Sequence, residues 1–167
     1  MRLTREFFNR DTVIVARELL GKCLVRKIDG KIVKAMITET EAYRGPEDKA
    51  CHASRGMTPR TKVMFGPPGH AYVYLIYGMY HCLNIVTEEE GYPAAVLIRG
   101  IENWDGPGKL CRELKIDRSL NAIDICASDE LWVEDAPAFP KNKIKTSKRI
   151  GVDYAGEWRR KPWRFYI

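Results

Sequence analysis

The sequence predicts a single α+β domain in which a curved, mainly antiparallel β-sheet packs against a few helices. A length of 167 residues suits one compact domain with its own core. Runs with strand character outnumber helical runs, and the connections between them suit hairpins. No repeat, low-complexity run or Ser/Gly linker divides the chain, so we assign residues 1–167 to one domain.

The first part of the chain is predicted to form a helix followed by a hairpin. Asp11 is a suitable N-cap for a helix over 12–20, and Gly21 suits the end of that helix. Asp29-Gly30 is a strong signal for a hairpin turn. It joins two segments with the pattern of strands, residues 22–28 and 31–43.

A long segment over residues 44–68 separates this hairpin from the later elements. It is polar and rich in Gly and Pro, and a loop of this length in a compact domain is usually functional. A short helix is predicted over 107–115, with Pro107 in its first turn. Further strands are predicted at residues 70–77, 81–87, 94–101, 131–134, 149–152 and 164–167.

The charge balance is compatible with a polyanionic partner. The chain has 28 Lys and Arg against 22 Asp and Glu, a net charge of +6, which permits binding to nucleic acid without requiring it. The basic segment 141–149 is either a phosphate-contacting loop or a plain solvated one. In the tail 157–167, where aromatic and basic residues alternate, a last strand with its aromatics packed inward is favoured over DNA contact.

Cysteine usage and hydropathy indicate a reduced, cytoplasmic protein. The five cysteines are odd in number and include no CxxC motif. Cys51-His52 and His81-Cys82 are adjacent pairs without the usual zinc spacing, so no metal is expected. No stretch approaches the roughly 20 apolar residues of a membrane span, and charges interrupt the apolar run of the N-terminus, unlike a signal peptide.

The motif ITETEAY offers a first group of candidate catalytic residues. Strand alternation would place Ile37, Glu39, Glu41 and Tyr43 on one face. A carboxylate beside an aromatic ring suits an enzyme that excises bases, because the carboxylate can activate water and the ring can stack on a base. On pattern alone, a solvent-facing strand whose glutamates keep it soluble is the more common explanation.

Four tyrosines fall within nine residues and form a second group. Tyr72 and Tyr74 would share one face of a strand, and Tyr77 precedes Gly78 at the expected turn. A tyrosine at a loop tip can act as a wedge between base pairs. Tyr72 and Tyr80 are expected to be packing residues, whereas composition leaves the roles of Tyr74 and Tyr77 open.

Three isolated polar residues, His52, Asn84 and Arg99, lie beside apolar segments. Taken alone, each is more often a satisfied buried group than a catalyst. The sequence GPPGH at 66–70 lacks the lysine and spacing of a phosphate-binding loop, and its prolines remove backbone donors. We interpret it as a rigid turn.

Long blocks of the chain closely resemble the alkyladenine (3-methyladenine) DNA glycosylase family. The resemblance covers nearly the whole chain and is far more specific than a short motif. The blocks are TETEAYRGPEDKACHASRGMTPRTKVMFGPPGHAYVYLIYGMYHCLNIV (38–86), AAVLIRG (94–100), GPGKLCRELKI (106–116) and RIGVDYAGEW…KPWRFYI (149–167).

The resemblance implies roles for two candidate catalytic residues and for one residue that inserts into DNA. Glu41 matches the family's general base, which activates the attacking water. Arg99 matches the arginine that helps to hold that water. Tyr77 matches the side chain that fills the gap left in the base stack.

The resemblance also implies a pocket for a flipped base. Tyr43, His52 and Tyr74 match the residues that sandwich and contact it, and Asn84 matches the residue that disfavours normal guanine. The implied reaction is monofunctional hydrolysis of the N-glycosidic bond of alkylated or deaminated purines, namely 3-methyladenine, 7-methylguanine, hypoxanthine and ethenoadenine. It takes place in double-stranded DNA and needs no metal or organic cofactor. A monomer that associates with the nucleoid is expected.

Three other functions stay open. A non-catalytic lesion-recognition protein would keep the same pocket, an RNA-binding module would keep the fold, and a hydrolase of free nucleosides would need neither the wedge nor the basic surface. One departure from the family lies between Arg99 and Gly106, where only residues 100–105 intervene. Relatives usually carry a longer helical segment there, so the extent of DNA contact is the property most open to change.

Overall fold

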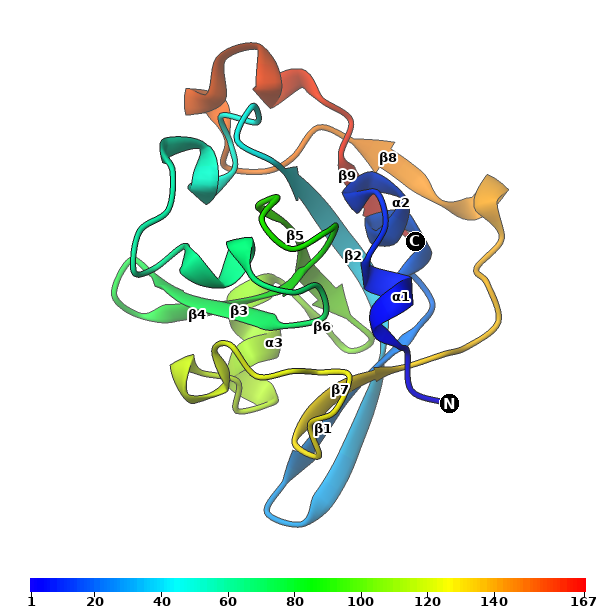
Figure 1. Cartoon of the computed structure of the whole chain (residues 1–167). Coiled ribbons are helices and arrows are strands. Elements are labelled where there is room, and N and C mark those ends of the chain that lie inside the picture. Colours follow the sequence, from blue (N-terminus) through cyan, green and yellow to red (C-terminus); the bar gives the residue numbers. More distant parts are fainter.

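The computed structural model describes residues 1–167 and contains an open nine-stranded antiparallel sheet with helices packed on it (Figure 1), which confirms the predicted fold class. The main strand order is β3-β4-β5-β2-β1-β7, β9 pairs with β2 and β8, and β6 pairs with β5. The strands are β1 (Cys23–Ile28), β2 (Lys31–Arg44), β3 (Ala71–Ile76), β4 (Tyr80–Val86), β5 (Ala94–Ile101), β6 (Trp104–Asp105), β7 (Leu131–Glu134), β8 (Lys145–Ser147) and β9 (Arg164–Tyr166).

The α-helices are short. They are α1 (Arg5–Phe8), α2 (Thr12–Glu18) and α3 (Pro107–Glu113). Single turns of 3-10 helix occur at His52–Arg55, Lys62–Phe65, Arg118–Leu120 and Lys141–Lys143, and a longer kinked one spans Asp153–Arg160. No helix is long and apolar enough to span a bilayer.

Local signals in the first part of the chain are confirmed. The Asp11 carboxylate accepts hydrogen bonds from the backbone N–H groups of Val13 and Ile14, which are the donors that the first turn of α2 leaves free. Asp29 and Gly30 have φ values of 50° and 78°. This left-handed pair is the geometry of a two-residue hairpin turn, and the β1–β2 hairpin extends from the lower edge of the sheet in Figure 1.

The strand predicted at residues 149–152 is wrong. Strand β8 lies just before it, and residues 149–152 form an irregular segment instead. The N–H of Ile150 donates to a side chain rather than to a neighbouring strand, and Gly151 adopts a φ of 74°. Tertiary contacts thus replace the ladder that the local pattern suggested.

The central strands separate a dry core from a hollow face. Helices α2 and α3 pack against β2, β4 and β5, and the largest buried cluster fills the space between them. That cluster takes alternate residues from the strands, among them Val73, Leu83, Ile85, Val96 and Ile98. The residues between them in sequence therefore face the other side of the sheet.

A β-bulge in β2 decides which carboxylates reach this other side. The pairing of β2 with β5 shifts register on both sides of Glu39. Ile37 is fully buried in the core cluster, so its predicted place on the face of Glu41 is wrong. The cause is one extra residue in the strand, which reverses the alternation between Ile37 and Glu39.

The hollow face is covered by segments distant in sequence. The segment after β2 and the C-terminal part of the chain, cyan and red in Figure 1, lie side by side above the sheet. The hydroxyl of Tyr154 in the C-terminal part donates to the carbonyl of Ala50 at 3.3 Å. These two segments and the sheet enclose the space described next.

Candidate active site

A cavity of about 540 Å³ lies on the hollow face of the sheet. The sheet, the segment after β2, the start of α3 and residues 150–154 all contribute to its lining. Six of the seven residues predicted as functional line it: Tyr43, His52, Tyr74, Tyr77, Asn84 and Arg99. The fold thus brings together residues that lie up to 56 positions apart in the sequence.

Strand register explains how these residues come together. Glu41 of β2 is opposite Leu97 of β5, Leu97 is opposite Asn84 of β4, and Asn84 is opposite Tyr72 of β3. Residues opposite one another in antiparallel strands project to the same side. A row of four side chains therefore crosses the sheet beneath the cavity.

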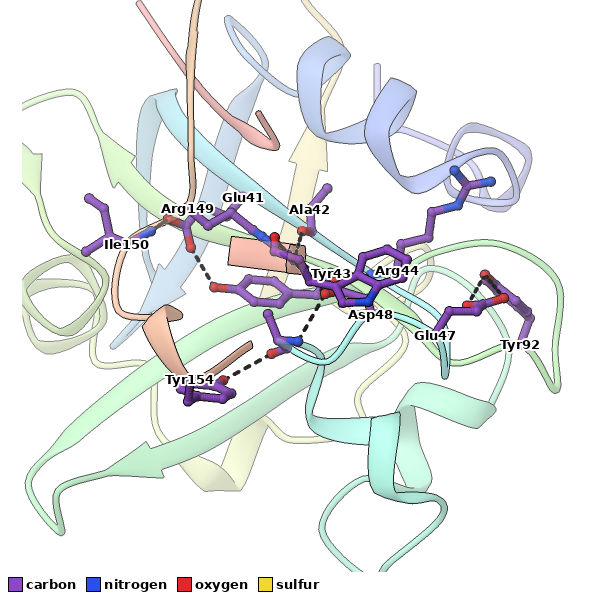
Figure 2. Close-up of polar contacts among 12 residues, drawn as sticks. Glu41, Ala42, Tyr43, Arg44, Glu47, Asp48, Tyr92, Arg149, Ile150 and Tyr154 are labelled. Atoms are coloured by element: carbon purple, nitrogen blue, oxygen red, sulfur yellow. Dashed lines mark hydrogen bonds and ion pairs between the residues drawn. The ribbon is translucent and has the colours of Figure 1, made fainter. Parts of the chain in front are cut away.

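Glu41, the seventh predicted residue, lies buried against the wall of this cavity. Its side chain has no solvent exposure. Tyr43 Oη donates to Oε2 at 2.7 Å, and the Ile150 N–H donates to Oε1 at 2.7 Å (Figure 2). Arg99 Nε lies 3.6 Å from Oε1. All three of these partners line the cavity. The carboxylate therefore lies directly behind the residues that form the cavity wall.

Opposing effects act on the proton affinity of Glu41. Burial raises the pKa of this carboxyl, because desolvation disfavours its charged form. The Arg99 charge and the hydrogen bonds from Tyr43 and Ile150 lower the pKa and offset part of that effect. A carboxylate with a raised pKa and three surrounding donors is a suitable acceptor for a proton from water.

Arg99 is held by a second glutamate. Its Nε donates to Glu39 Oε1 at 3.0 Å, and the same oxygen accepts Arg164 Nε of β9 at 2.6 Å. The Arg99 side chain is 16% exposed. Only its Nε is engaged with carboxylates, and the residue contributes to the lining of the cavity.

A cluster of rings forms one side of the cavity. The centroids of His52 and Tyr74 are 4.6 Å apart, and His52 Nδ1 lies 3.1 Å from the hydroxyl of the buried Tyr72. Burial, with the nearby Arg60 charge, lowers the pKa of His52 to about 4. The imidazole is therefore neutral near pH 7 and can act as a hydrogen-bond partner or a stacking surface.

Asn84 is fixed at the floor of the cavity. The side chain donates through Nδ2 to the carbonyl of Tyr72 at 3.2 Å, and the residue is only 4% exposed. An amide held in this way has little freedom to move away from a ligand. Its position suits a residue that tests the shape of a bound base.

Tyr77 projects from the tip of the β3–β4 hairpin at the mouth of the cavity. It is 85% exposed and adopts a φ of 54°, next to Gly78 at 66°. Tyr80 at the other end of the turn lies against Gly108 of α3 and is 50% exposed, so it makes a packing contact, as predicted, and keeps half of its surface accessible. A large aromatic held out of the core by a tight turn exposes an apolar surface to a partner.

Sequence reasoning missed four residues around Glu41. Glu39 was placed on the right strand face without a role, and Ile150 contributes a backbone N–H, which leaves no sequence signal. Asp48 and Arg149 form a fully buried ion pair. The prediction of phosphate contact by 141–149 therefore fails for Arg149, although the lysines of that segment are exposed.

A more polar hollow of about 700 Å³ adjoins the cavity and shares His52 and Tyr154 with it. Lys49, Arg55 and Arg60 contribute basic side chains to its lining. No cluster of three or more His, Cys, Asp or Glu side chains that could hold a metal ion is present.

Comparison with known proteins gives extensive matches. The family described as Methylpurine-DNA glycosylase (MPG) matches residues 6–105 and 103–167. These two parts meet at the β5–β6 hairpin, where a longer segment is expected in relatives.

Three relatives illustrate how close the matches are. Proteins from Methanocella arvoryzae, Desulfitobacterium hafniense and Clostridium perfringens (strain 13) are 56%, 49% and 48% identical to this chain. The alignments cover 98%, 99% and 100% of this chain and 91%, 95% and 96% of those proteins. Each of the three carries the name "Putative 3-methyladenine DNA glycosylase".

Proposed function

Because this chain belongs to the methylpurine-DNA glycosylase family, we propose that it extrudes damaged purines from duplex DNA into the cavity above the sheet and hydrolyses their N-glycosidic bonds. The observation that carries this proposal is the Glu41 carboxylate, buried at the cavity wall between Tyr43 and Arg99. The class of enzyme, a DNA glycosylase that hydrolyses N-glycosyl bonds, follows from the family itself.

Extrusion of a nucleotide requires compensation for lost stacking. Unpairing and unstacking cost a few kcal/mol, and the cost is smallest for damaged bases that pair poorly. Tyr77 would enter the gap in the duplex, and its exposure at the hairpin tip beside the cavity supports this role. Lys49, Arg55 and Arg60 in the adjoining hollow are placed to accept phosphates of the same strand.

Ring faces would hold the extruded base. 3-Methyladenine and 7-methylguanine are cationic in the nucleotide, and a cation on an aromatic face gains about 0.5–2 kcal/mol. Tyr43, Tyr74 and the neutral His52 supply these faces. Asn84 would exclude undamaged guanine, because the fixed amide leaves no room for its exocyclic amine.

Bond cleavage then needs an acceptor for one proton. The oxygen of a water bonds to C1′ while the bond from C1′ to the purine nitrogen breaks, and the base leaves with that electron pair. The water proton passes to Glu41. Positive charge develops on the sugar in such reactions, and the ionised carboxylate stabilises it until the water oxygen has bonded.

The class of the base decides how much further help is required. A cationic purine departs as a neutral molecule, so Glu41 and the ring faces are sufficient. Hypoxanthine and ethenoadenine are neutral and require a proton on the leaving base as well. We therefore propose the methylated purines as the main substrates, consistent with the names of the relatives.

Incubation with duplexes that carry single lesions tests this function. Duplexes with 7-methylguanine, hypoxanthine, ethenoadenine or an undamaged purine are treated with the protein and then with alkali, which cleaves at abasic sites. The expected result is strand cleavage at the lesions alone. Binding to lesion DNA with no release of base would instead favour a recognition protein, and preference for structured RNA or for free nucleosides would favour the other two alternatives.

The assembly state is part of the same proposal. Every side chain of the cavity and of the Glu41 environment comes from one chain. We therefore propose that a monomer is active. Light scattering coupled to gel filtration, run at the concentration of the activity assay, would contradict this if only larger assemblies were present.

A further inference from the structure

The ion pair between Asp48 and Arg149 lies behind the cavity wall, out of reach of a bound base. Both side chains have 0% exposure, and neither lines the cavity. Nη1 and Nη2 of Arg149 donate to Oδ2 and Oδ1 of Asp48 at 2.5 and 3.0 Å. Two parallel bonds of this kind fix orientation as well as distance.

The Asp48 carboxylate organises the turn that follows β2. It accepts the backbone N–H of Arg44 at 3.1 Å through Oδ2 and that of Ala50 at 3.0 Å through Oδ1. Ala50 lines the cavity. One side of the ion pair is therefore bonded directly to the backbone of the cavity wall (Figure 2).

The Arg149 guanidinium joins three other parts of the chain. It donates to the carbonyl of Ala42 in β2 and to that of Trp158, both at 3.0 Å. Its Cζ lies 5.0 Å from the centre of the Tyr43 ring and 5.1 Å from that of Trp163. Arg149 therefore supports from behind the ring that faces the cavity.

The residue after Arg149 supplies the amide that contacts Glu41. The Ile150 N–H donates to Glu41 Oε1 at 2.7 Å, and residues 149–152 have no strand neighbour to hold them. The side chain of Arg149 anchors this segment at one end, and the buried Val152, which packs with Ala50 and Ala155, anchors it at the other. Two of the three donors around Glu41 depend on this arginine. The Tyr43 ring lies against its guanidinium, and Ile150 follows it in the sequence.

Stability alone is a weak explanation for such an arrangement. Apolar pairs of similar volume usually stabilise a fold as well as a buried ion pair does or better. Arg149 Nε is in addition the one buried side-chain nitrogen or oxygen without a hydrogen-bond partner. The Asp48–Arg149 pair therefore places two charges and one unsatisfied donor at a position where an apolar contact would fill the space.

We propose that Asp48 and Arg149 are positioning residues for base removal, which hold the Tyr43 ring and the Ile150 amide against Glu41 without contacting the substrate. The inference rests on the proposed function. Loss of the pair then has two effects. The water and the base are held less accurately, and the charged form of Glu41 loses donors.

Several groups face Glu41 and set the pH dependence together. Arg99 from β5, Tyr43 from β2 and the amide of Ile150 contact it, Arg149 adds its charge from behind, and Cys82 of β4 lies near enough to interact. Glu39 acts on it through Arg99. Removal of Arg149 takes away one of the effects that lower the pKa of Glu41, and a weaker hold on Tyr43 and Ile150 takes away two more. The pKa of Glu41 therefore rises, and activity should begin to rise only at higher pH.

The test uses single-turnover release of 7-methylguanine from duplex DNA across pH 5–9. Arg149→Lys keeps a charge beside Asp48 but not the planar fork, and Asp48→Asn with Arg149→Met removes both charges and so avoids a lone buried ion. In the double variant the rate should fall about 100-fold, as expected for a small misplacement of reacting groups. Its acid limb should move upward by about one pH unit, while affinity for lesion DNA stays within threefold.

A matched control is available at another buried arginine. Arg26 is 8% exposed and donates to the backbone carbonyls of Lys27, Leu114, Lys115 and Glu130, and its Nη1 lies 3.7 Å from the exposed carboxylate of Glu130. Arg26→Lys should lower the melting temperature and leave the rate and the acid limb unchanged. If the folded Arg149 variants behave like this control, the positioning role is wrong and the pair is structural.

An NMR measurement separates this proposal from the proposed function. In protein labelled with ¹⁵N-isoleucine, the Ile150 amide should titrate with Glu41, and Glu41→Gln should abolish that titration. The double variant should lose the downfield shift of this amide and titrate at higher pH. An unchanged Ile150 resonance in the folded double variant overturns the positioning proposal. Absence of base release by the wild type, with the Ile150 effect present, overturns the proposed function alone.

Discussion

The hydroxyl of Tyr43 donates a 2.7 Å hydrogen bond to Oε2 of Glu41, two residues earlier on the same strand. The other carboxylate oxygen accepts the Ile150 amide at the same distance. Each carboxylate oxygen has two lone-pair sites, and each of these two hydrogen bonds uses one of them. Tyr43 belongs both to the wall of the cavity and to the immediate surroundings of Glu41, and these two contributions can be separated by mutation.

Replacement of Glu41 by Gln should abolish base release and spare binding. The amide is isosteric and can still accept from Ile150 and face the Tyr43 hydroxyl, so the cavity keeps its shape. A general base contributes about 10²–10⁴-fold to rate. Single-turnover release should fall by at least that range, with affinity for lesion DNA unchanged. The exposed Glu90→Gln serves as the control, and full activity of Glu41→Gln would remove Glu41 from this role.

Replacement of Tyr43 by Phe should change the pH profile more than the affinity. The ring stays, but the charged form of Glu41 loses a hydrogen bond, so the pKa of Glu41 rises. The base must be ionised to accept a proton, and the acid limb of the rate profile should therefore move to higher pH. Tyr43→Leu, which removes the ring as well, should weaken lesion binding. Identical profiles for wild type and Tyr43→Phe would contradict the assigned hydrogen bond.

Replacement of Tyr77 by Ser should weaken capture of extruded bases. Stacking of one aromatic side chain on a base contributes about 1–3 kcal/mol, so affinity for lesion duplex should fall roughly tenfold or more. The residue is 85% exposed, and the melting temperature should not change. Ile32→Ala, at the 56% exposed side chain on the distant β1–β2 hairpin, is the control. Unchanged lesion affinity in Tyr77→Ser would rule out the wedge.

Replacement of Asn84 by Ser should admit guanine. The smaller side chain opens space at the cavity floor, and the Tyr72 carbonyl loses the donor that it has now. The expected outcome is measurable release of undamaged guanine, with release of methylated purines reduced less than tenfold. Selectivity is read from the ratio of the two rates on otherwise identical duplexes. No change in that ratio would show that Asn84 does not discriminate.

Burial of the neutral His52 side chain should make the protein less stable as the pH falls below about 6.5. Burial lowers its pKa from the ordinary 6.5 to about 4. A depressed histidine pKa means that the unfolded state binds the proton more readily, so the contribution is complete above about pH 6.5 and is lost as the pH falls towards 4. Between pH 7 and 4.5 the free energy of unfolding should fall by about 2 kcal/mol more in wild type than in His52→Gln. Urea unfolding at the two pH values measures this, and equal losses would contradict it.

Local sequence patterns were sufficient to predict the start of α2 and the turn of the β1–β2 hairpin. Asp11 and Asp29-Gly30 act through bonds and dihedral angles within a few residues, so their consequences can be read from short stretches. The same holds for Tyr77, whose place beside Gly78 at a turn predicts exposure. The resemblance to a known family supplied the grouping of Glu41 with Arg99, because pattern alone favoured a solvated strand.

The parts that sequence reasoning missed depend on contacts between distant segments. The segment that begins at Arg149 was expected to be a strand, but its partner is Asp48, 101 positions away. Glu39 holds Arg99 in place because Arg99 and Arg164 both donate to one of its carboxylate oxygens. Neither pairing can be predicted from the residues that flank it in the sequence.

The β-bulge in β2 makes the orientation of Glu41 depend on the number of residues between Ile37 and Thr40. Thr38 and Glu39 both lie against Gly100, where an added Cβ would come within 3.1 and 3.2 Å of them, so glycine is the residue that tolerates two neighbours there. Deletion of one of these two residues would restore perfect alternation to the strand. The later side chains of β2 would then exchange faces, so that Glu41 would point into the hydrophobic core while Thr40 and Ala42 pointed towards the cavity. The protein could keep its sheet after such a deletion and still lose the Glu41 carboxylate from the wall of the cavity.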